Sequence, residues 1–301
     1  MSTSLTIAQA HLLALFFASS FVGSLYVSKR TRLAFREHHE RWRDDHTVIR
    51  ARLVACTVST TICVFTVAWV HSRVLGSQNG LLETAKATAH RLGLTIHPSW
   101  TSLTSLLITP LLFTGPLYAM YISATLPFMY HWSFHLDVVD KFFTWQGIRN
   151  YIVAPITEEI VFRACVLAVY DLAGASRRGM TLFTPLSFGL AHVHHAWETF
   201  NKYGRTSNAA KRAVVNSLVQ LTYTTLFGAY CAYLFLRTGS IFPPISAHAF
   251  CNVMGLPELR REMGMFPSRK YMIVVMYLVG VTAFANRLRP WTKSEYSIYW
   301  I

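Results

Sequence analysis

The run LVACTVSTTICVFTVAWVHS, residues 53–72, contains no Asp, Glu, Lys or Arg. Its length matches the roughly 20 apolar residues that a helix needs to cross the hydrocarbon core of a bilayer. Backbone groups in lipid must bond within their own segment, so we expect a helix here and not an irregular loop. The whole chain of 301 residues supports this interpretation, because 52% is hydrophobic and only 14% is charged, against about 25% in soluble domains.

Similar apolar stretches recur along the chain, and together they predict an all-α, polytopic membrane protein with about eight transmembrane helices. No internal repeat or low-complexity tract marks a second domain, so residues 1–301 are treated as a single integral-membrane domain. Pro110, Pro116 and Pro127 are able to break the third segment into two pieces. The expected helices cover residues 7–28, 53–72, 101–127, 149–170, 180–197, 213–236, 241–256 and 271–286.

The net charge of +14 comes mainly from the connections between these apolar stretches. The loop 29–52 holds eight Lys and Arg residues against four acidic ones, so the positive-inside rule places it in the cytosol. Basic clusters at 202–212, 260–270 and 287–293 are expected on the same side. A protein that binds nucleic acid would concentrate such charge on a soluble module, and the sequence contains no such module. We therefore predict no nucleic-acid partner.

One apolar segment carries two adjacent carboxylates and an arginine, in the run APITEEIVFR at residues 154–163. Charged side chains within a membrane are costly and usually functional. Glu159 and Arg163 are four residues apart and lie on one helix face, so we expect Arg163 to neutralise Glu159. Glu158 points about 100° away and is left free to act as a general base. Thr157 has the character of a helix N-cap. The alternative is an acid–base pair that only locks two helices together.

A second apolar stretch, FGLAHVHH at residues 188–195, holds three histidines. His192 and His195 are three residues apart and share a helix face, whereas His194 points elsewhere. Imidazoles are good zinc ligands, but the spacing is not the H-E-x-x-H pattern of a zinc protease. One or two of the three are equally well explained as hydrogen-bonded core residues.

The third feature is the run ISAHAFCNVMG at residues 245–255. His248 and Asn252 are four residues apart, and two such donors are suited to stabilise an oxyanion; the alternative is one hydrogen-bonded pair between helices. Combined with Glu158, they suggest hydrolysis by an activated water. Nucleophilic alternatives are weaker. Ser246 does not face His248 on a helix, and nothing in the sequence activates the Cys251 thiol.

Taken in order, these motifs resemble those of the type II CaaX prenyl endopeptidases, which belong to the CPBP or ABI clan of glutamic intramembrane proteases. The resemblance covers residues 150–257, which are therefore interpreted as the catalytic, motif-bearing helices. The matching motifs are Glu158-Glu159-x-x-x-Arg163, Phe188-x-x-x-His192 and His248-x-x-x-Asn252.

The resemblance implies a multi-pass enzyme of the endoplasmic reticulum membrane whose active site is accessible from the cytosol. It implies removal of the last three residues, -aaX, from prenylated CaaX proteins such as small GTPases, with no metal or other cofactor. Membrane lipids are expected partners of the basic loops. By motif, the resemblance assigns water activation to Glu158 and His192, an oxyanion hole to His248 and Asn252, and supporting roles to Glu159 and Arg163. The Phe188-x-x-x-His192 motif selects His192, and His195, one turn further on, is expected to share or assist its role.

Two other classes of protein compete with this interpretation. A non-catalytic membrane scaffold with the same helices would be favoured by broken motifs, and all three motifs are intact. A transporter that relays protons through Glu158, Glu159 and the histidines would predict inverted repeats and paired broken helices, and no such pairing is visible in the sequence.

Overall fold

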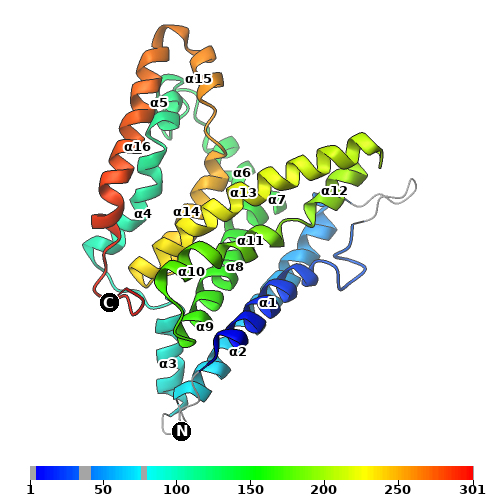
Figure 1. Ribbon diagram of the computed structural model, residues 1–301. Coiled ribbons are helices and arrows are strands. Elements are labelled where there is room, and N and C mark those ends of the chain that lie inside the picture. The colour runs from blue at the N-terminus through cyan, green and yellow to red at the C-terminus, as the bar shows by residue number, and fades with distance from the viewer. Residues whose placement is uncertain (1–4, 34–41, 76–79, 301) are drawn as a thin grey trace.

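The computed structural model describes residues 5–33, 42–75 and 80–300, and within those ranges every regular element is a helix (Figure 1). The predicted all-α class is therefore confirmed. At one side of the molecule, α1 (Ile7–Ser24) packs against α2 (His46–Leu75). At the other side, α16 (Lys270–Thr292) packs along α4 (Trp100–Leu112) and α5 (Thr114–Ile122). Between them, α13 (Ser207–Thr238) packs against α14 (Phe242–Met254). Two shorter helices complete the arrangement: α3 (Leu81–Arg91) contacts α2, and α15 (Leu259–Met265) contacts α16.

Three helical segments are long and apolar enough to cross a bilayer within the described ranges. They are α1, α2 and the segment Pro267–Thr292, which contains α16. The pair α4 and α5 adds a fourth if it counts as one span, although it bends by 67°. The bend lies at Phe113, between Pro110 and Pro116, as the proline content of this segment predicted. The predicted count of about eight spans is not confirmed.

The uncharged segment 180–197 forms no single helix long enough to cross a bilayer. It is divided among α10 (Arg177–Phe183), α11 (Pro185–Ala191) and α12 (His195–Lys202). A helix of seven residues is only about 10 Å long, whereas the hydrocarbon core is about 30 Å thick. At 13 residues, α14 is also too short to cross alone. A stretch without charges can therefore be divided into short helices, and here these leave apolar side chains such as Leu182 (59%) and Leu190 (61%) exposed.

The two adjacent glutamates lie on a continuous helical stretch from Trp145 to Leu172. It consists of α7 (Trp145–Gly147), the π-helical η2 (Ile148–Val153), α8 (Ala154–Glu159), the π-helical η3 (Ile160–Cys165) and α9 (Val166–Leu172). Such π segments occur frequently at functional sites. Here they flank α8 on both sides.

The prediction that Thr157 caps a helix is wrong. An N-cap residue has extended backbone and accepts a hydrogen bond from the first turn of its helix. Thr157 instead lies inside the helical stretch, and its hydroxyl donates to the Val153 carbonyl at 2.8 Å. The cap of this stretch is Thr144, whose ψ is 159° and whose hydroxyl accepts from the Gly147 amide at 3.1 Å.

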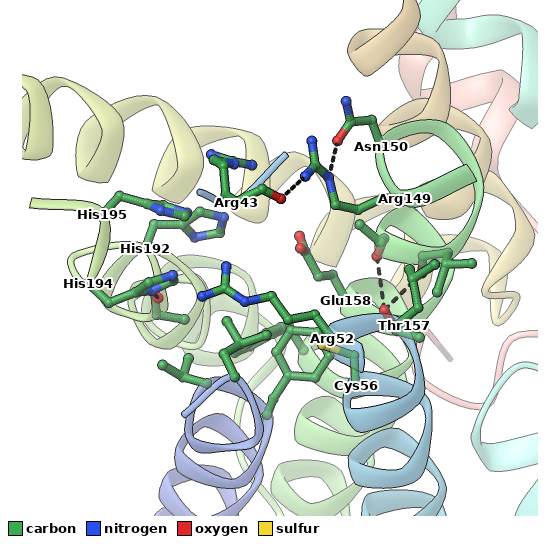
Figure 2. Close-up of a pocket in the computed structure, with 18 residues that line it drawn as sticks. Arg43, Arg52, Cys56, Arg149, Asn150, Thr157, Glu158, His192, His194 and His195 are labelled. Carbon is green, nitrogen blue, oxygen red and sulfur yellow. Dashed lines mark hydrogen bonds between the residues drawn. The ribbon is translucent and has the colours of Figure 1, made fainter. Parts of the chain in front are cut away.

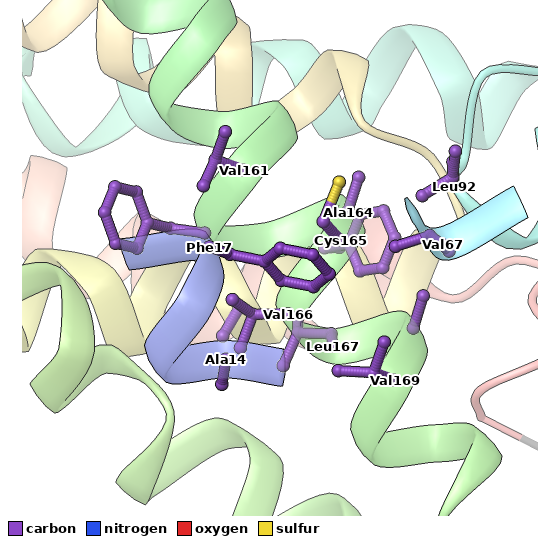
Figure 3. Close-up of a cluster of buried hydrophobic side chains, with 14 of the residues drawn as sticks. Ala14, Phe17, Val67, Leu92, Val161, Ala164, Cys165, Val166, Leu167 and Val169 are labelled. Carbon is purple, nitrogen blue, oxygen red and sulfur yellow. The ribbon is translucent and has the colours of Figure 1, made fainter. Parts of the chain in front are cut away.

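The largest cluster of buried apolar side chains surrounds this helix (Figure 3). Cys165, Val166 and Leu167 have no exposed surface, and they pack with Phe17 of α1 and Val67 of α2. In a membrane such packing acts through close van der Waals contact and not through removal of surface from water. The cluster therefore fixes the position of the glutamates against α1 and α2.

Candidate active site

Glu159 and Arg163 form a fully enclosed ion pair. The Nε atom of Arg163 lies 3.1 Å from Oε2 of Glu159, and the two side chains are 2% and 0% exposed. The contact between positions i and i+4 is the one that helix spacing predicts. The other carboxylate oxygen, Oε1, accepts a hydrogen bond at 2.7 Å from Nδ1 of His248 on α14. Glu159 thus has an ion-pair partner at Oε2 and a hydrogen-bond donor at Oε1.

Close packing surrounds the Arg163 guanidinium on its other sides. Its Cζ lies 4.2 Å from the centre of the Phe188 ring, an arrangement that gives a cation–π interaction. A Cβ atom at Gly228 of α13 would lie 3.3 Å from Nη2 of Arg163 and 2.9 Å from Cβ of Pro185. Gly228 therefore permits α11 and α13 to approach one another over the arginine.

Glu158 faces a different environment from its neighbour. Its side chain is 19% exposed and lines a cavity of about 140 Å³ (Figure 2). Glu159 does not line this cavity, so the structure separates the two carboxylates as helix geometry predicts. The same cavity is lined by His192, His194 and His195. A water molecule in this cavity would be within reach of a carboxylate and of imidazoles together.

His192 is oriented by its own helix. Its Nδ1 atom lies 2.8 Å from the Phe188 carbonyl, and its ring packs edge-on against the Phe188 ring at 4.7 Å between centres. Because a carbonyl oxygen only accepts, Nδ1 carries the hydrogen and the neutral ring keeps its lone pair on Nε2. His192 therefore offers an acceptor for a water hydrogen.

His248 and Asn252 differ in how close they come to Glu158. The Nε2 atom of His248 lies 3.9 Å from Oε2 of Glu158, which is near but beyond hydrogen-bond range. Asn252 is exposed, and its side-chain amide donates to the backbone carbonyl of Asn150 at 2.8 Å. Neither residue lines the cavity that contains Glu158. The structure thus brings Glu158, His192 and His195 into one cavity and leaves Asn252 at its outer side, joined to Asn150.

His194, His195 and Glu198 form a candidate metal-binding group, with one ligand atom of each lying within 4.8 Å of the others. His194 donates from Nδ1 to the Ala191 carbonyl at 2.6 Å, which leaves the Nε2 lone pair free, as in many metal sites. Glu158 and His192 are outside this group. The prediction that the enzyme uses no metal stays a prediction, and a chelator tests it.

Three arginines that the sequence analysis did not place in the site also line the cavity, namely Arg43, Arg52 and Arg149 (Figure 2). Each nitrogen of Arg149 donates one hydrogen bond: Nη2 donates to Asp44, Nη1 to the Arg43 carbonyl and Nε to the Asn150 side chain, each at 2.8 Å. A signal for Arg52 was present in the sequence, because it is the last charge before the uncharged run 53–72.

Comparisons with known proteins identify the family of this chain. Residues 140–254 match a family model described as "Type II CAAX prenyl endopeptidase Rce1-like". A protein of Schizosaccharomyces pombe named "Probable CAAX prenyl protease 2" is 33% identical over 92% of this chain and 91% of its own length. "CAAX prenyl protease 2" of Homo sapiens is 35% identical over 92% of this chain and 79% of its own length. The Arabidopsis thaliana protein of that name is 40% identical over 48% of this chain and 44% of its own. No solved structure matches the chain.

The helical fold, the apolar spans and these relatives define a membrane-bound endopeptidase. Within that class, the chain belongs to the family of type II CAAX prenyl endopeptidases. The family resemblance based on the three motifs is thereby confirmed, as is the expectation of an enzyme.

Proposed function

We propose that this endopeptidase removes the C-terminal -aaX tripeptide from prenylated CaaX proteins such as small GTPases, and that it does so with Glu158 as the general base. Its site of action is the cytosolic side of the endoplasmic reticulum membrane. The observation that carries the mechanism is the separation of the two glutamates. Glu159 is occupied by Arg163 and His248, whereas Glu158 lines an open cavity with His192.

The proposed reaction begins with a water held between Glu158 and Nε2 of His192. Glu158 accepts one proton from the water while the oxygen attacks the carbonyl carbon of the prenylated cysteine. A tetrahedral oxyanion forms. When the C–N bond breaks, the proton on Glu158 passes to the leaving nitrogen and the oxyanion becomes the new carbonyl. The resulting prenyl-cysteine carboxylic acid then gives its remaining hydroxyl proton to the released amine, so the products are a carboxylate and a tripeptide with a free ammonium terminus. Glu158 ends in its starting state.

His248 and Asn252 are the proposed donors to the oxyanion. The Nδ1–H group of His248 is engaged with Glu159, so a donor on Nε2 requires a doubly protonated ring. Asn252 has one amide hydrogen engaged with Asn150 and a second one available. Both residues lie four apart on α14 and hence on one face of that helix. Donors that are fixed before the reaction stabilise developing charge most effectively.

The membrane setting suits a lipid-modified substrate. Apolar side chains are exposed along α1, α2 and α16, including Leu12 (67%), Phe65 (70%) and Leu278 (62%). Such surfaces match the hydrocarbon region of a bilayer, into which a prenyl chain also partitions. The basic clusters fit the anionic lipids of the cytosolic leaflet. A prenylated protein can thus approach laterally while its peptide tail enters from the cytosol.

The decisive experiment incubates membranes that carry the full-length chain with a farnesylated CaaX peptide and measures release of -aaX. Glu158→Gln keeps the size of the side chain and removes its basicity, so we expect activity to fall at least 100-fold, as for loss of a general base. Glu83→Gln on the exposed surface of α3 is the matched control and should retain full activity. A parallel reaction contains a zinc chelator.

Each outcome separates the candidate functions. Activity that Glu158→Gln abolishes and the chelator leaves intact supports the proposal. Chelator-sensitive cleavage would assign water activation to a metal ion held by His194, His195 and Glu198. Absence of cleavage by a correctly inserted wild-type chain would refute the peptidase and favour a scaffold or a proton-coupled transporter.

A further inference from the structure

Arg52 has hydrogen-bonding capacity that no group in the described part of the chain satisfies. The residue is 9% exposed, and its Nε atom donates to the Thr31 carbonyl at 2.9 Å. Its Nη2 atom is buried and has no hydrogen-bond partner. Its Nη1 atom lies 3.9 Å from Oε1 of Glu198, too far for a hydrogen bond. Buried guanidinium groups are normally paired, and beyond its ion pair with Glu198 this one keeps an unsatisfied donor at Nη2.

The cavity that Arg52 lines is the one that contains Glu158. Figure 2 shows the Arg52 side chain extending into it from α2, with His194 and His192 nearby. Its charged lining residues are Arg43, Arg52 and Arg149 against Glu158 alone. Asp44 neutralises Arg149, and Glu198 partly balances Arg52 at 3.9 Å. With Asp44 and Glu198 counted, three carboxylates face the three arginines, so the unsatisfied Nη2 donor of Arg52, and not a net charge, indicates an anionic ligand.

The proposed substrate carries an anion at the required position. A CaaX tail ends in a free carboxylate, three residues beyond the bond that Glu158 would hydrolyse. Three extended residues span at most about 10 Å. The group that binds this carboxylate must therefore lie in the same cavity as the catalytic base, as Arg52 does. Arginine is the residue best suited to it, because its planar fork binds both oxygens of a carboxylate.

We infer that Arg52 binds the C-terminal carboxylate of the substrate and so measures the three-residue distance to the scissile bond. The inference rests on the proposed function. Arg149 is the weaker candidate, because each of its three nitrogens already donates one hydrogen bond. Arg43 is exposed and would act by charge at longer range. Glu198 is the competing acceptor, which the substrate carboxylate displaces or joins.

The test compares two farnesylated peptides of the same sequence, one ending in a carboxylate and one in a carboxamide, on the full-length enzyme in membranes. The wild type should cleave the acid with a kcat/KM about 10- to 100-fold above that of the amide, as for loss of a charge-assisted contact. Arg52→Gln should lower the value for the acid to that for the amide, mainly through KM. The amide itself should be cleaved as by the wild type.

Two further variants guard against misfolding and non-specific effects. Arg73→Gln removes an exposed charge from the other end of α2 and should leave kcat/KM unchanged for both peptides. Glu198→Gln removes the competing carboxylate and should raise the ratio of kcat/KM for the acid to that for the amide, a ratio that cancels effects through His195, whose Nδ1 lies 3.3 Å from Oε2 of Glu198. This second variant keeps Arg52 in place, so it tests the same contact even if Arg52→Gln does not insert.

The outcomes distinguish the subsite from the catalytic function. Equal cleavage of acid and amide by the wild type overturns the carboxylate subsite while leaving the peptidase intact. A uniform loss on both substrates in Arg52→Gln, together with no effect of Glu198→Gln, assigns Arg52 a structural role and also overturns the inference. Absence of any cleavage by the wild type refutes the proposed function itself.

Discussion

The enclosed charge of Glu159 provides a sharp test of how the site is held together. In Arg163→Met the methionine fills much of the arginine's volume but leaves the Glu159 carboxylate facing only His248. Removing one partner of a buried ion pair typically costs about 3–5 kcal/mol. Loss of the contact with Phe188, whose ring centre lies 4.2 Å from Cζ, adds up to about 2 kcal/mol. Set against a typical total stability of about 5–15 kcal/mol, this is a large fraction.

The assay is denaturant unfolding of the purified chain in mixed micelles, followed by tryptophan fluorescence. The double variant Glu159→Gln with Arg163→Met removes the unpaired charge as well, so it should recover about 0.5–3 kcal/mol relative to Arg163→Met alone. Arg261→Met serves as the matched control, because Arg261 pairs with Glu258 on an exposed surface. Its unfolding midpoint should equal that of the wild type.

A stability of Arg163→Met within about 1 kcal/mol of the wild type would refute this reasoning. It would mean that Glu159 takes up a proton or reaches solvent when its partner is lost. If the double variant is no more stable than Arg163→Met alone, the lost stability comes from packing against Phe188 and not from the unpaired charge.

Three smaller perturbations test the same geometry. Gly228→Val should lower both stability and activity, because the new Cβ would lie 2.9 Å from Cβ of Pro185. Gly23→Ala is the control, because its Cβ would have no atom within 4 Å, and its thermal unfolding midpoint in detergent should be unchanged or slightly raised. Thr157→Val should lose about 0.5–1.5 kcal/mol of stability in the same unfolding assay and keep its rate of -aaX release, because its hydroxyl bonds only to helix carbonyls. Asn252→Ala should lower kcat for the farnesylated peptide by about 100-fold, as for loss of an oxyanion donor, with little change in KM; an effect on KM alone would contradict that role.

Local contacts within the site could be predicted from spacing alone. The Glu159–Arg163 pair needs only the geometry of one helix, and the structure contains it. The contact of Glu159 with His248 joins residues 89 positions apart, so it depends on how α14 packs against α8. No pattern in one sequence encodes that packing. The position of Asn252 beside Asn150 is hidden for the same reason.

Absence of charge was an incomplete guide to the transmembrane helices. It identifies segments that avoid water, but it does not tell whether lipid or protein surrounds them. The segment 180–197 forms short helices that bury Phe188, which is 2% exposed, but leave Leu182 (59%) and Leu190 (61%) exposed. Counting charges also misplaced Arg52, which it assigned to a loop. The positive-inside rule treats such a residue as part of a loop, whereas Arg52 lies on α2 with its side chain turned into the cavity.

The two π-helical segments determine where insertions and deletions can be tolerated during evolution. Each π turn holds one more residue than an α turn. A lineage that loses a residue from Ile148–Val153 or Ile160–Cys165 can therefore return that turn to ordinary α geometry with little displacement of the neighbouring core. Within Ala154–Glu159 no such reserve exists. A deletion there rotates the two flanking parts of the helix by about 100° relative to each other. Insertions and deletions are therefore tolerable within the two π-helical segments and damaging within α8.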